Sequence, residues 1–227
     1  MLNRHEAVMP ANPPDEHSPE RLIAPAASLN DLRNAARDCR GCDIWMRATQ
    51  TVFGEGGRDA EVIFVGEQPG NSEDLEGRPF VGPAGKLLDR ALEEAGIDRG
   101  KVYITNMVKH FNSIQRGKFR IHKKPNAQQI AACHPWLDAE IALIRPKVVV
   151  CLGATAAQAL ISRNFRVLSQ RGKLMESPLA PLITATIHPS SILRSPDEES
   201  RRAEMRRFVK DLTKIAGHLP ASALIRK

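Results

Sequence analysis

Three polar residues directly follow short apolar segments that are typical of buried β-strands. Glu67 comes after VIFVG, Asn106 after VYIT, and His188 after LITATI. The carboxyl ends of parallel strands meet at one edge of a sheet, and open α/β sheets bind their ligands there. A carboxylate and an imidazole at such an edge can stabilise opposite charges that develop during a reaction. We therefore interpret Glu67 and His188 as candidate catalytic residues and Asn106 as a candidate ligand-binding residue.

Each of these residues also has a structural interpretation. Glu67 can be a solvated residue of a glycine-rich connection, Asn106 a turn residue after a strand, and His188 a structural histidine at a strand end. The expected convergence of all three residues on one edge of the sheet favours the catalytic interpretation, because binding alone does not require it.

A stretch rich in glycine and proline follows the first of these strands. Gly66 opens the motif GEQPG, where the absence of a side chain lets main-chain amides approach a ligand, and Gln68 is the third residue of that motif. The later motif GRPFVGPAG predicts a stiff turn that presents Phe80 and begins the next helix. Core packing of Phe80 and solvation of Gln68 are the alternatives.

The segment GKFRIHKKP, residues 117–125, is strongly basic. It contains Arg120 and His122, and no acidic residue lies between Lys109 and Lys124. Such a loop is typical of phosphate binding. The imidazole of His122 is also a potential nucleophile, and the cations beside it disfavour a further positive charge on its ring. From composition alone, a histidine that contacts phosphate is the better interpretation.

Four cysteines suggest a metal centre. Cys39 and Cys42 form a C-x-x-C motif, Cys133 lies in a later helical segment, and Cys151 ends an apolar strand segment. In a reducing compartment this pattern favours zinc or an iron-sulfur cluster over disulfides. Packing of a thiol in the core is the alternative for Cys133 and more strongly for Cys151. The spacing does not choose between His110 and Cys151 as a fourth ligand.

Strand and helix patterns alternate along the chain, which predicts an α/β fold with a parallel sheet and helices on both faces. We expect a flexible leader over residues 1–27, one domain over 28–217 and a tail over 218–227. The leader contains several prolines and has no apolar period.

Ser28 and Asp31 predict the start of a short helix. The segment 107–125 matches neither period, so we expect a long loop there. The expected strands cover 61–66, 102–105, 147–153 and 182–188, and the expected helices 28–39, 83–96, 126–144, 154–161 and 198–217.

The charge balance points to a polyanionic partner. The 227 residues carry a formal net charge of +7, and contacts between basic side chains and phosphates release counterions. No apolar run approaches the roughly 20 residues of a membrane span, and the amino terminus has no apolar signal segment. We expect a cytoplasmic protein that does not enter membranes.

The motifs GEQPG, GRPFVGPAG, VYITNMVKH and HPSSILR, together with the C-x-x-C, resemble the uracil-DNA glycosylase superfamily. The resemblance runs from about Cys39 to Arg194 and is closest to the iron-sulfur branch, family 4, and within it to the UdgX type. It implies a three-layer α/β/α sandwich around a short central parallel sheet. It also implies a 4Fe-4S cluster whose ligands are Cys39, Cys42, His110 and Cys133, with Cys151 as a core thiol.

The UdgX type carries a basic insertion that usually reads KRRIH and here reads KFRIH, so that Phe119 replaces an arginine. In that type the histidine attacks the deoxyribose and stays covalently attached to the DNA. The resemblance therefore implies that His122 forms an adduct with C1′ of the abasic site after uracil has left. The implied roles of the other site residues are as follows: Glu67 stabilises the sugar cation, His188 stabilises the leaving uracil, Gln68 holds the attacking group or the sugar, and Phe80, Asn106, Arg120 and Gly66 bind the substrate.

The predicted function is thus excision of uracil from DNA, preferably single-stranded, by a monomer that reacts once. One alternative is a family 4 glycosylase that turns over and uses His122 only to contact DNA. An alternative of another class is a non-catalytic iron-sulfur module that binds single-stranded DNA. In that case replacing Glu67 would leave its function intact.

Overall fold

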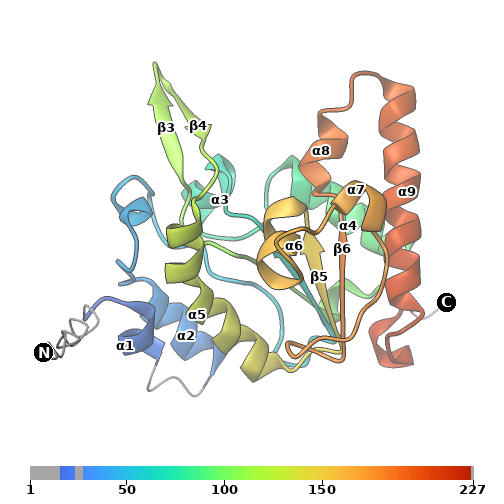
Figure 1. Ribbon diagram of the computed structural model, residues 1–227, viewed down its shortest axis with the longest axis horizontal. Coiled ribbons are helices and arrows are strands. Elements are labelled where there is room, and N and C mark those ends of the chain that lie inside the picture. Colours follow the sequence, from blue (N-terminus) through green and yellow to red (C-terminus); the bar gives the residue numbers. More distant parts are fainter. Residues whose placement is uncertain (1–15, 24–27, 226–227) are drawn as a thin grey trace, which may run out of the picture.

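A four-stranded parallel sheet lies at the centre of the computed structural model, which describes residues 16–23 and 28–225 (Figure 1). Its strands, in the order β2-β1-β5-β6, are β2 (Val102–Asn106), β1 (Val62–Gly66), β5 (Val148–Leu152) and β6 (Leu182–Thr186). Every residue of β1, β2 and β5 is buried. These strands read as continuous apolar runs because helices cover both of their faces. The prediction of a parallel sheet is confirmed.

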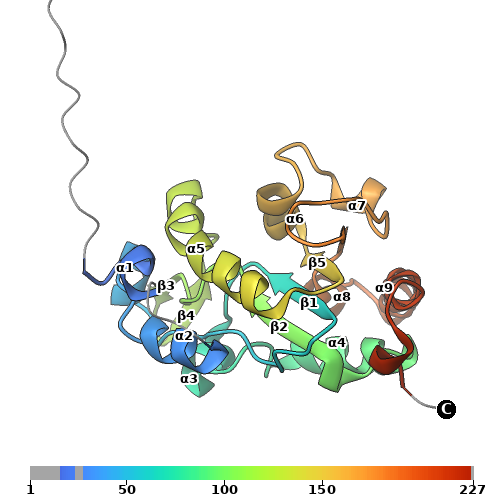
Figure 2. The same ribbon diagram turned by 90° about the horizontal axis from the view of Figure 1, so that it is seen from below.

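The helices form one layer on each side of this sheet (Figure 2). α4, α8 and α9 pack against one another, whereas α6 packs against β1 and β5. Right-handed crossovers between parallel strands require the connecting helices to divide between the two faces in this way. The architecture is therefore the predicted α/β/α sandwich. The helices are α1 (Pro19–Ile23), α2 (Leu29–Ala36), α3 (Asn71–Glu76), α4 (Pro83–Glu94), α5 (Ala127–Ile144), α6 (Ala154–Leu160), α7 (Val167–Gln170), α8 (Pro189–Leu193) and α9 (Glu198–Ala216), with 3-10 turns at Asp43–Met46, Arg99–Lys101 and Ala221–Ala223.

Side-chain caps set where several helices begin. Ser28 Oγ accepts a hydrogen bond from the main-chain N–H of Asp31 at 3.1 Å, so α2 starts where its sequence predicts. Asn126 and Gln129 form a reciprocal capping box at the start of α5. This second cap fixes where the basic segment, residues 117–125, ends and α5 begins.

The segment 107–125 differs from the loop that we expected. It contains a β-hairpin, β3 (Ser113–Arg116) and β4 (Phe119–His122), that projects beyond the carboxyl end of the sheet (Figure 1). Gly117 has a φ of 58° and opens the two-residue turn, as in type II′ hairpins. Both strands are mostly exposed and bury no apolar face. The prediction of an irregular loop was wrong because two short exposed strands leave little apolar periodicity in the sequence.

Parts of both predicted terminal segments belong to the fold. α1, within the predicted leader, packs against α2 and α5 and buries Pro19. In the predicted tail, Ala223 O accepts a hydrogen bond from Asp98 N, and Ile225 N donates one to Gly96 O. Residues 1–15, 24–27 and 226–227 lie outside the described residues. Among the residues described, no helix is long and apolar enough to cross a membrane.

A buried ion pair lies between β2 and α5. Lys109 Nζ is 2.6 Å from Glu140 Oε2, and at most 1% of either side chain is exposed. Besides Lys109, the donors around this carboxylate are the hydroxyls of Tyr103 and Thr105 and the main-chain N–H of Gly54. Buried charges persist only when they are paired and hydrogen-bonded in this manner.

We therefore expect Glu140→Ala to lower the free energy of unfolding by about 3–5 kcal/mol, because it leaves the Lys109 ammonium buried without a countercharge. Urea denaturation followed by circular dichroism measures this loss. Glu94→Ala is the matched control, since Glu94 pairs with Arg90 on the exposed face of α4, and it should cost less than about 1 kcal/mol. An equal loss of unfolding free energy in both variants would contradict a stabilising role for the buried Lys109–Glu140 pair.

Candidate active site

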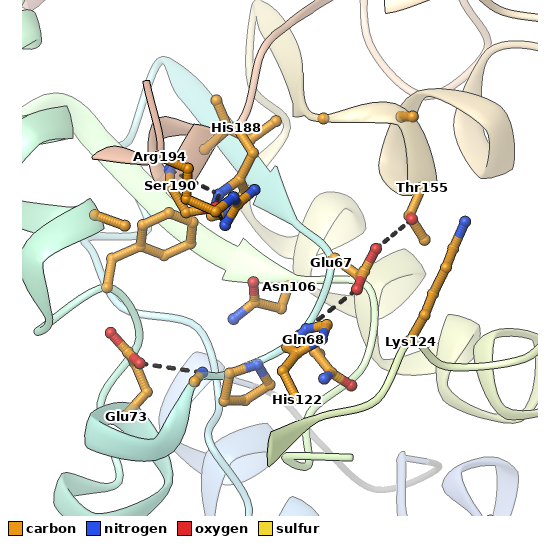
Figure 3. Close-up of a pocket in the computed structure, with 17 residues that line it drawn as sticks. Glu67, Gln68, Glu73, Asn106, His122, Lys124, Thr155, His188, Ser190 and Arg194 are labelled. Carbon is orange, nitrogen blue, oxygen red and sulfur yellow. Dashed lines mark hydrogen bonds and ion pairs between the residues drawn. The ribbon is translucent and has the colours of Figure 1, made fainter. Parts of the chain in front are cut away.

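A pocket of about 660 Å³ lies at the carboxyl ends of the strands, between the base of the hairpin and α8 (Figure 3). Six of the predicted site residues line it: Glu67, Gln68, Phe80, Asn106, His122 and His188. The other two predicted substrate-binding residues, Gly66 and Arg120, are not among its lining residues. The structure thus brings together the residues that the sequence placed on different strand ends.

Glu67 contacts side chains on both sides of the pocket. One carboxylate oxygen accepts a hydrogen bond from the Thr155 hydroxyl, and the other lies 3.3 Å from His122 Nε2 (Figure 3). Burial raises the pKa of the Glu67 carboxyl, but its hydrogen bonds with His122 and Thr155 and the nearby positive charge of Lys124 outweigh burial. Its pKa therefore lies below the usual range, and Glu67 is a carboxylate at neutral pH.

His188 is held as a neutral ring. Its Nδ1 accepts a hydrogen bond from the main-chain N–H of Ser190 at 3.2 Å and lies 2.8 Å from the Ser190 hydroxyl. Since Nδ1 is an acceptor, the single proton of the neutral imidazole lies on Nε2, which remains available as a donor. Burial lowers the pKa of His188 to about 4, and the positive charge of Arg194 acts in the same direction. The carboxylate of Glu67 opposes this shift only in part.

Asn106 and Gly66 are partners across the β1–β2 ladder. The Asn106 side chain is almost fully buried, and its Oδ1 has no hydrogen-bond partner. An unpaired buried acceptor is costly unless a ligand supplies a donor. A Cβ atom at position 66 would collide with this Oδ1 and with the Phe80 ring. The absence of a side chain at Gly66 therefore leaves space for Asn106 and Phe80, which line the pocket.

Phe80 has an unusual main-chain conformation, with a φ of 55°. Few residues other than glycine adopt it, and such strain persists only where the surroundings enforce it. Glu73 provides part of that enforcement, because its carboxylate accepts hydrogen bonds from Gly70 N at 3.0 Å and Gly82 N at 2.8 Å. The Phe80 ring lies 5.7 Å from the His188 ring, centroid to centroid. The strained turn thus holds a flat apolar surface beside the imidazole.

Arg120 contacts the body of the protein. Its NH1 donates to Asp74 Oδ2 at 2.6 Å and to Thr49 Oγ1 at 3.1 Å, and its Nε donates to Asn71 Oδ1 at 2.9 Å. The Asp74 side chain is fully buried. This ion pair ties the hairpin to α3, whereas the role that we predicted for Arg120 was substrate binding, which stays a prediction.

Three of the cysteines lie near one another: Cys39 and Cys42 follow α2, and Cys133 lies within α5. The Sγ atoms of Cys39 and Cys133 accept hydrogen bonds at 3.2 Å, from Trp136 Nε1 and Lys109 N respectively. Burial raises the pKa of the Cys133 thiol to about 12, although the positive charge of Lys109 and the hydrogen bond from its main-chain N–H act in the opposite direction. Cys151 is buried in β5 with no cause of its raised pKa other than burial. Among the described residues, no three His, Cys, Asp or Glu side chains are placed to hold a single metal ion.

His110 adjoins this group through the neighbouring Lys109, and its ring is buried. Thr51 Oγ1 donates its proton to Ala36 O at 2.8 Å and lies 2.9 Å from His110 Nε2. Because that hydroxyl proton is already used, Nε2 must be the donor in its contact with Thr51, and Nδ1 keeps a free lone pair. Burial lowers the pKa of His110 to about 4. A neutral imidazole with a free nitrogen is the form that ligates a metal.

Sequence reasoning missed several residues that support the site. Thr155, at the start of α6, follows β5 and could have been found by the same strand-end rule that identified Glu67. Asp74 and Thr51 gave no such indication, because both lie in polar stretches whose partners are distant in the sequence.

The family model described as the uracil DNA glycosylase superfamily matches residues 53–213. The chain therefore belongs to the uracil DNA glycosylase superfamily, as its motifs predicted. It is similar to the type-4 uracil-DNA glycosylase of Thermotoga maritima, with 39% identity over 167 residues, covering 73% of this chain and 83% of that protein. It is also similar to the type-4 uracil-DNA glycosylases of Sulfurisphaera tokodaii and Pyrobaculum aerophilum. The first is 38% identical over 75% of this chain and 78% of that protein. The second is 35% identical over 83% and 93%.

The buried His188 makes stability depend on pH. In the folded chain its pKa is about 4, against an ordinary value of 6.5. Between these values the unfolded chain binds a proton that the folded chain does not, so stability falls as the pH is lowered from about 6.5 towards 4. This loss amounts to at most about 3 kcal/mol. Urea unfolding at pH 6.5 and 4.5 should show a smaller loss for His188→Asn than for the unsubstituted protein, and equal losses would contradict the assignment.

Proposed function

We propose that this protein excises uracil from DNA and that His122 then captures the abasic sugar in a covalent adduct. The observation that carries the adduct is the position of His122 Nε2, 3.3 Å from the carboxylate of Glu67 at the mouth of the pocket. Half of the His122 side chain is exposed, so a DNA strand entering the pocket can reach it. Membership of the superfamily and the relatives named type-4 uracil-DNA glycosylases support the excision step.

Uracil recognition is assigned to Asn106. Its unpaired Oδ1 can accept the N3–H proton of uracil, and its Nδ2 can donate to O4. Cytosine presents the opposite pattern at these positions, so it would leave the buried amide mispaired. Stacking on Phe80 compensates in part for unstacking the base. Unstacking costs less in a single strand than in a duplex, which supports the proposed preference for single-stranded DNA.

The two charges of the transition state meet complementary groups. As the bond between C1′ and N1 breaks, its electron pair leaves with uracil and positive charge develops on the sugar. The Glu67 carboxylate stabilises the sugar cation, and the Nε2–H of neutral His188 donates to the uracil anion. The pKa of His188 is about 4, so its ring is neutral at physiological pH and acts as a hydrogen-bond donor instead of a cation.

His122 then replaces water as the nucleophile. For this step the neutral ring takes the tautomer with its proton on Nδ1, so that Nε2 gives up its hydrogen bond to Glu67 and uses its lone pair to form the bond to C1′. The resulting imidazolium releases the Nδ1 proton to solvent, and the uracil anion takes up one proton. The net reaction exchanges the C1′–N1 bond for a C1′–Nε2 bond and consumes no water. No step regenerates the free imidazole, so each molecule reacts once.

A denaturing gel tests this proposal. The protein is incubated with a uracil-containing single strand, and we expect a heat-stable band that contains protein and DNA. His122→Ala should release uracil but give free abasic DNA instead of the band. His134→Ala is the matched control, because His134 lies on the outer surface of α5, and it should form the adduct normally.

Other outcomes separate the alternatives. Abasic product in excess over protein, without a band, would support a glycosylase that turns over. Release of no uracil, with DNA binding retained in Glu67→Ala, would support a non-catalytic binding module. Either result would contradict the covalent reaction.

We also propose that Cys39, Cys42, Cys133 and His110 hold a 4Fe-4S cluster. A four-iron cluster takes each ligand on a different iron, so its ligands stand apart and need not converge on one point. Two features support the fit: N–H donors already point at the Cys39 and Cys133 sulfurs, and the His110 lone pair on Nδ1 is free. Excision needs no electron transfer, so this group would stabilise the segments that it joins.

Cys39→Ala should remove the brown colour and the absorbance near about 400 nm that iron-sulfur proteins show. Cys151→Ala is the matched control, since Cys151 is buried in β5, and it should keep both. Loss of iron in Cys151→Ala together with its retention in His110→Ala would overturn the choice of the fourth ligand. Iron content per protein is the measurement.

A further inference from the structure

The β3–β4 hairpin has two faces that differ in what they contact. Alternate residues of a strand point to the same side, so Arg120 and His122 share one face. Arg120 pairs with Asp74 on α3, and His122 Nε2 lies 3.3 Å from the carboxylate of Glu67. This inner face therefore contacts the domain, and the opposite, outer face turns away from it.

The outer face carries exposed apolar side chains. Ile114 and Ile121 are partners across the two strands, and Phe119 is the partner of Arg116. Residues that alternate along paired strands form one continuous surface, so these four side chains lie together. The exposed fractions are 49% for Ile114, 42% for Ile121 and 62% for Phe119. Apolar side chains that gather on an exposed surface indicate a site for a partner.

Positive charges surround the Phe119 ring. Lys118 Nζ lies 5.6 Å from the ring centroid, and the exposed Arg116 is the cross-strand partner of Phe119. No acidic residue lies between Lys109 and Lys124. A second copy of this face would carry the same charges, so repulsion disfavours self-association. A flat ring among cations is instead the arrangement that binds single-stranded nucleic acid, because bases stack on the ring and phosphates meet the cations.

The outer face is close to the pocket and is presented in a fixed orientation. At the stem of the hairpin, the Gln68 amide nitrogen donates to Asn112 O and to Lys123 O, both at 3.2 Å. A surface that is already ordered binds a flexible ligand at a lower entropy cost. Phe119 precedes His122 by three residues, which is about 10 Å along β4. A DNA strand whose uracil lies in the pocket can therefore also reach Phe119.

We infer that the Phe119 ring is a stacking platform for an unpaired base that neighbours the uracil in the same DNA strand. Ile114 and Ile121 extend the platform towards the stem, while Arg116 and Lys118 hold the adjoining phosphates. A base in a duplex is stacked on both of its sides and has no free face, so the platform selects single strands. This inference rests on the proposed excision of uracil from DNA.

Phe119→Leu tests the inference, because leucine is apolar but has no flat ring. Fluorescence anisotropy measures binding to a single strand in which a 2′-fluorine on the uridine sugar destabilises the sugar cation and so slows excision. We expect at least about fivefold weaker binding, whereas Phe119→Trp should bind as tightly as the unsubstituted protein. Ile225→Ala is the matched control, since Ile225 is an exposed apolar residue beside Gly96, ahead of β2, and it should leave binding unchanged.

A second strand separates base stacking from other contacts. It has the same fluorinated uridine but carries baseless spacers on both sides of it, so that the phosphates remain and no neighbouring base can stack. On this strand we expect Phe119→Leu and the unsubstituted protein to bind equally. Weakening by the same factor on both strands would overturn the inference, and so would unchanged binding of Phe119→Leu to the first strand.

Failure of the proposed function has a separate readout. It would appear as no release of uracil from an ordinary single strand by the unsubstituted protein, whereas binding to the two fluorinated strands alone decides whether Phe119 stacks with a base. Analytical ultracentrifugation without DNA tests the other occupant of the outer face. A dimer that Phe119→Leu abolishes would show that this face joins two copies of the chain and would overturn the inference.

Discussion

The close approach of β1 and β2 at Gly66 and Asn106 is the constraint on which the site depends. These residues are partners in the parallel ladder, and the missing side chain at Gly66 leaves room for the Asn106 amide and the Phe80 ring. A larger residue would displace both of these groups, which line the pocket. The next residue, Glu67, leaves β1 at the same point, so one short stretch of main chain both positions this carboxylate and leaves the space that the Asn106 amide occupies.

The parts of the structure that a sequence can predict are those that repeat a physical pattern. The four buried strands, the helices between them and the meeting of Glu67, Asn106 and His188 follow from apolar runs and from the geometry of parallel sheets. The hairpin escaped prediction because its strands are exposed and have no core to face. The partners of Gln68 and Arg120 escaped as well, because these contacts join segments that are distant in the sequence.

Burial keeps both His110 and His188 neutral, but the two rings present different groups to their surroundings. Burial lowers the pKa of both His110 and His188 to about 4, and in each ring a hydrogen bond to one nitrogen fixes the state of the other. In His188 the fixed proton makes Nε2 a donor, and in His110 the fixed proton on Nε2 leaves Nδ1 as an acceptor. The local hydrogen bond, more than the residue type, defines what each imidazole can do.

The β3–β4 hairpin contacts the rest of the domain at its stem and through Arg120, whereas the four strands of the central sheet pair only with one another. In the proposed reaction, removal of the base and capture of the sugar therefore depend on different parts of the chain. A protein that keeps its DNA product acts in proportion to its abundance instead of its turnover rate. In the proposed reaction, the capacity of this protein to shield abasic sites is set by how many copies the cell makes, and each copy reacts with a single lesion.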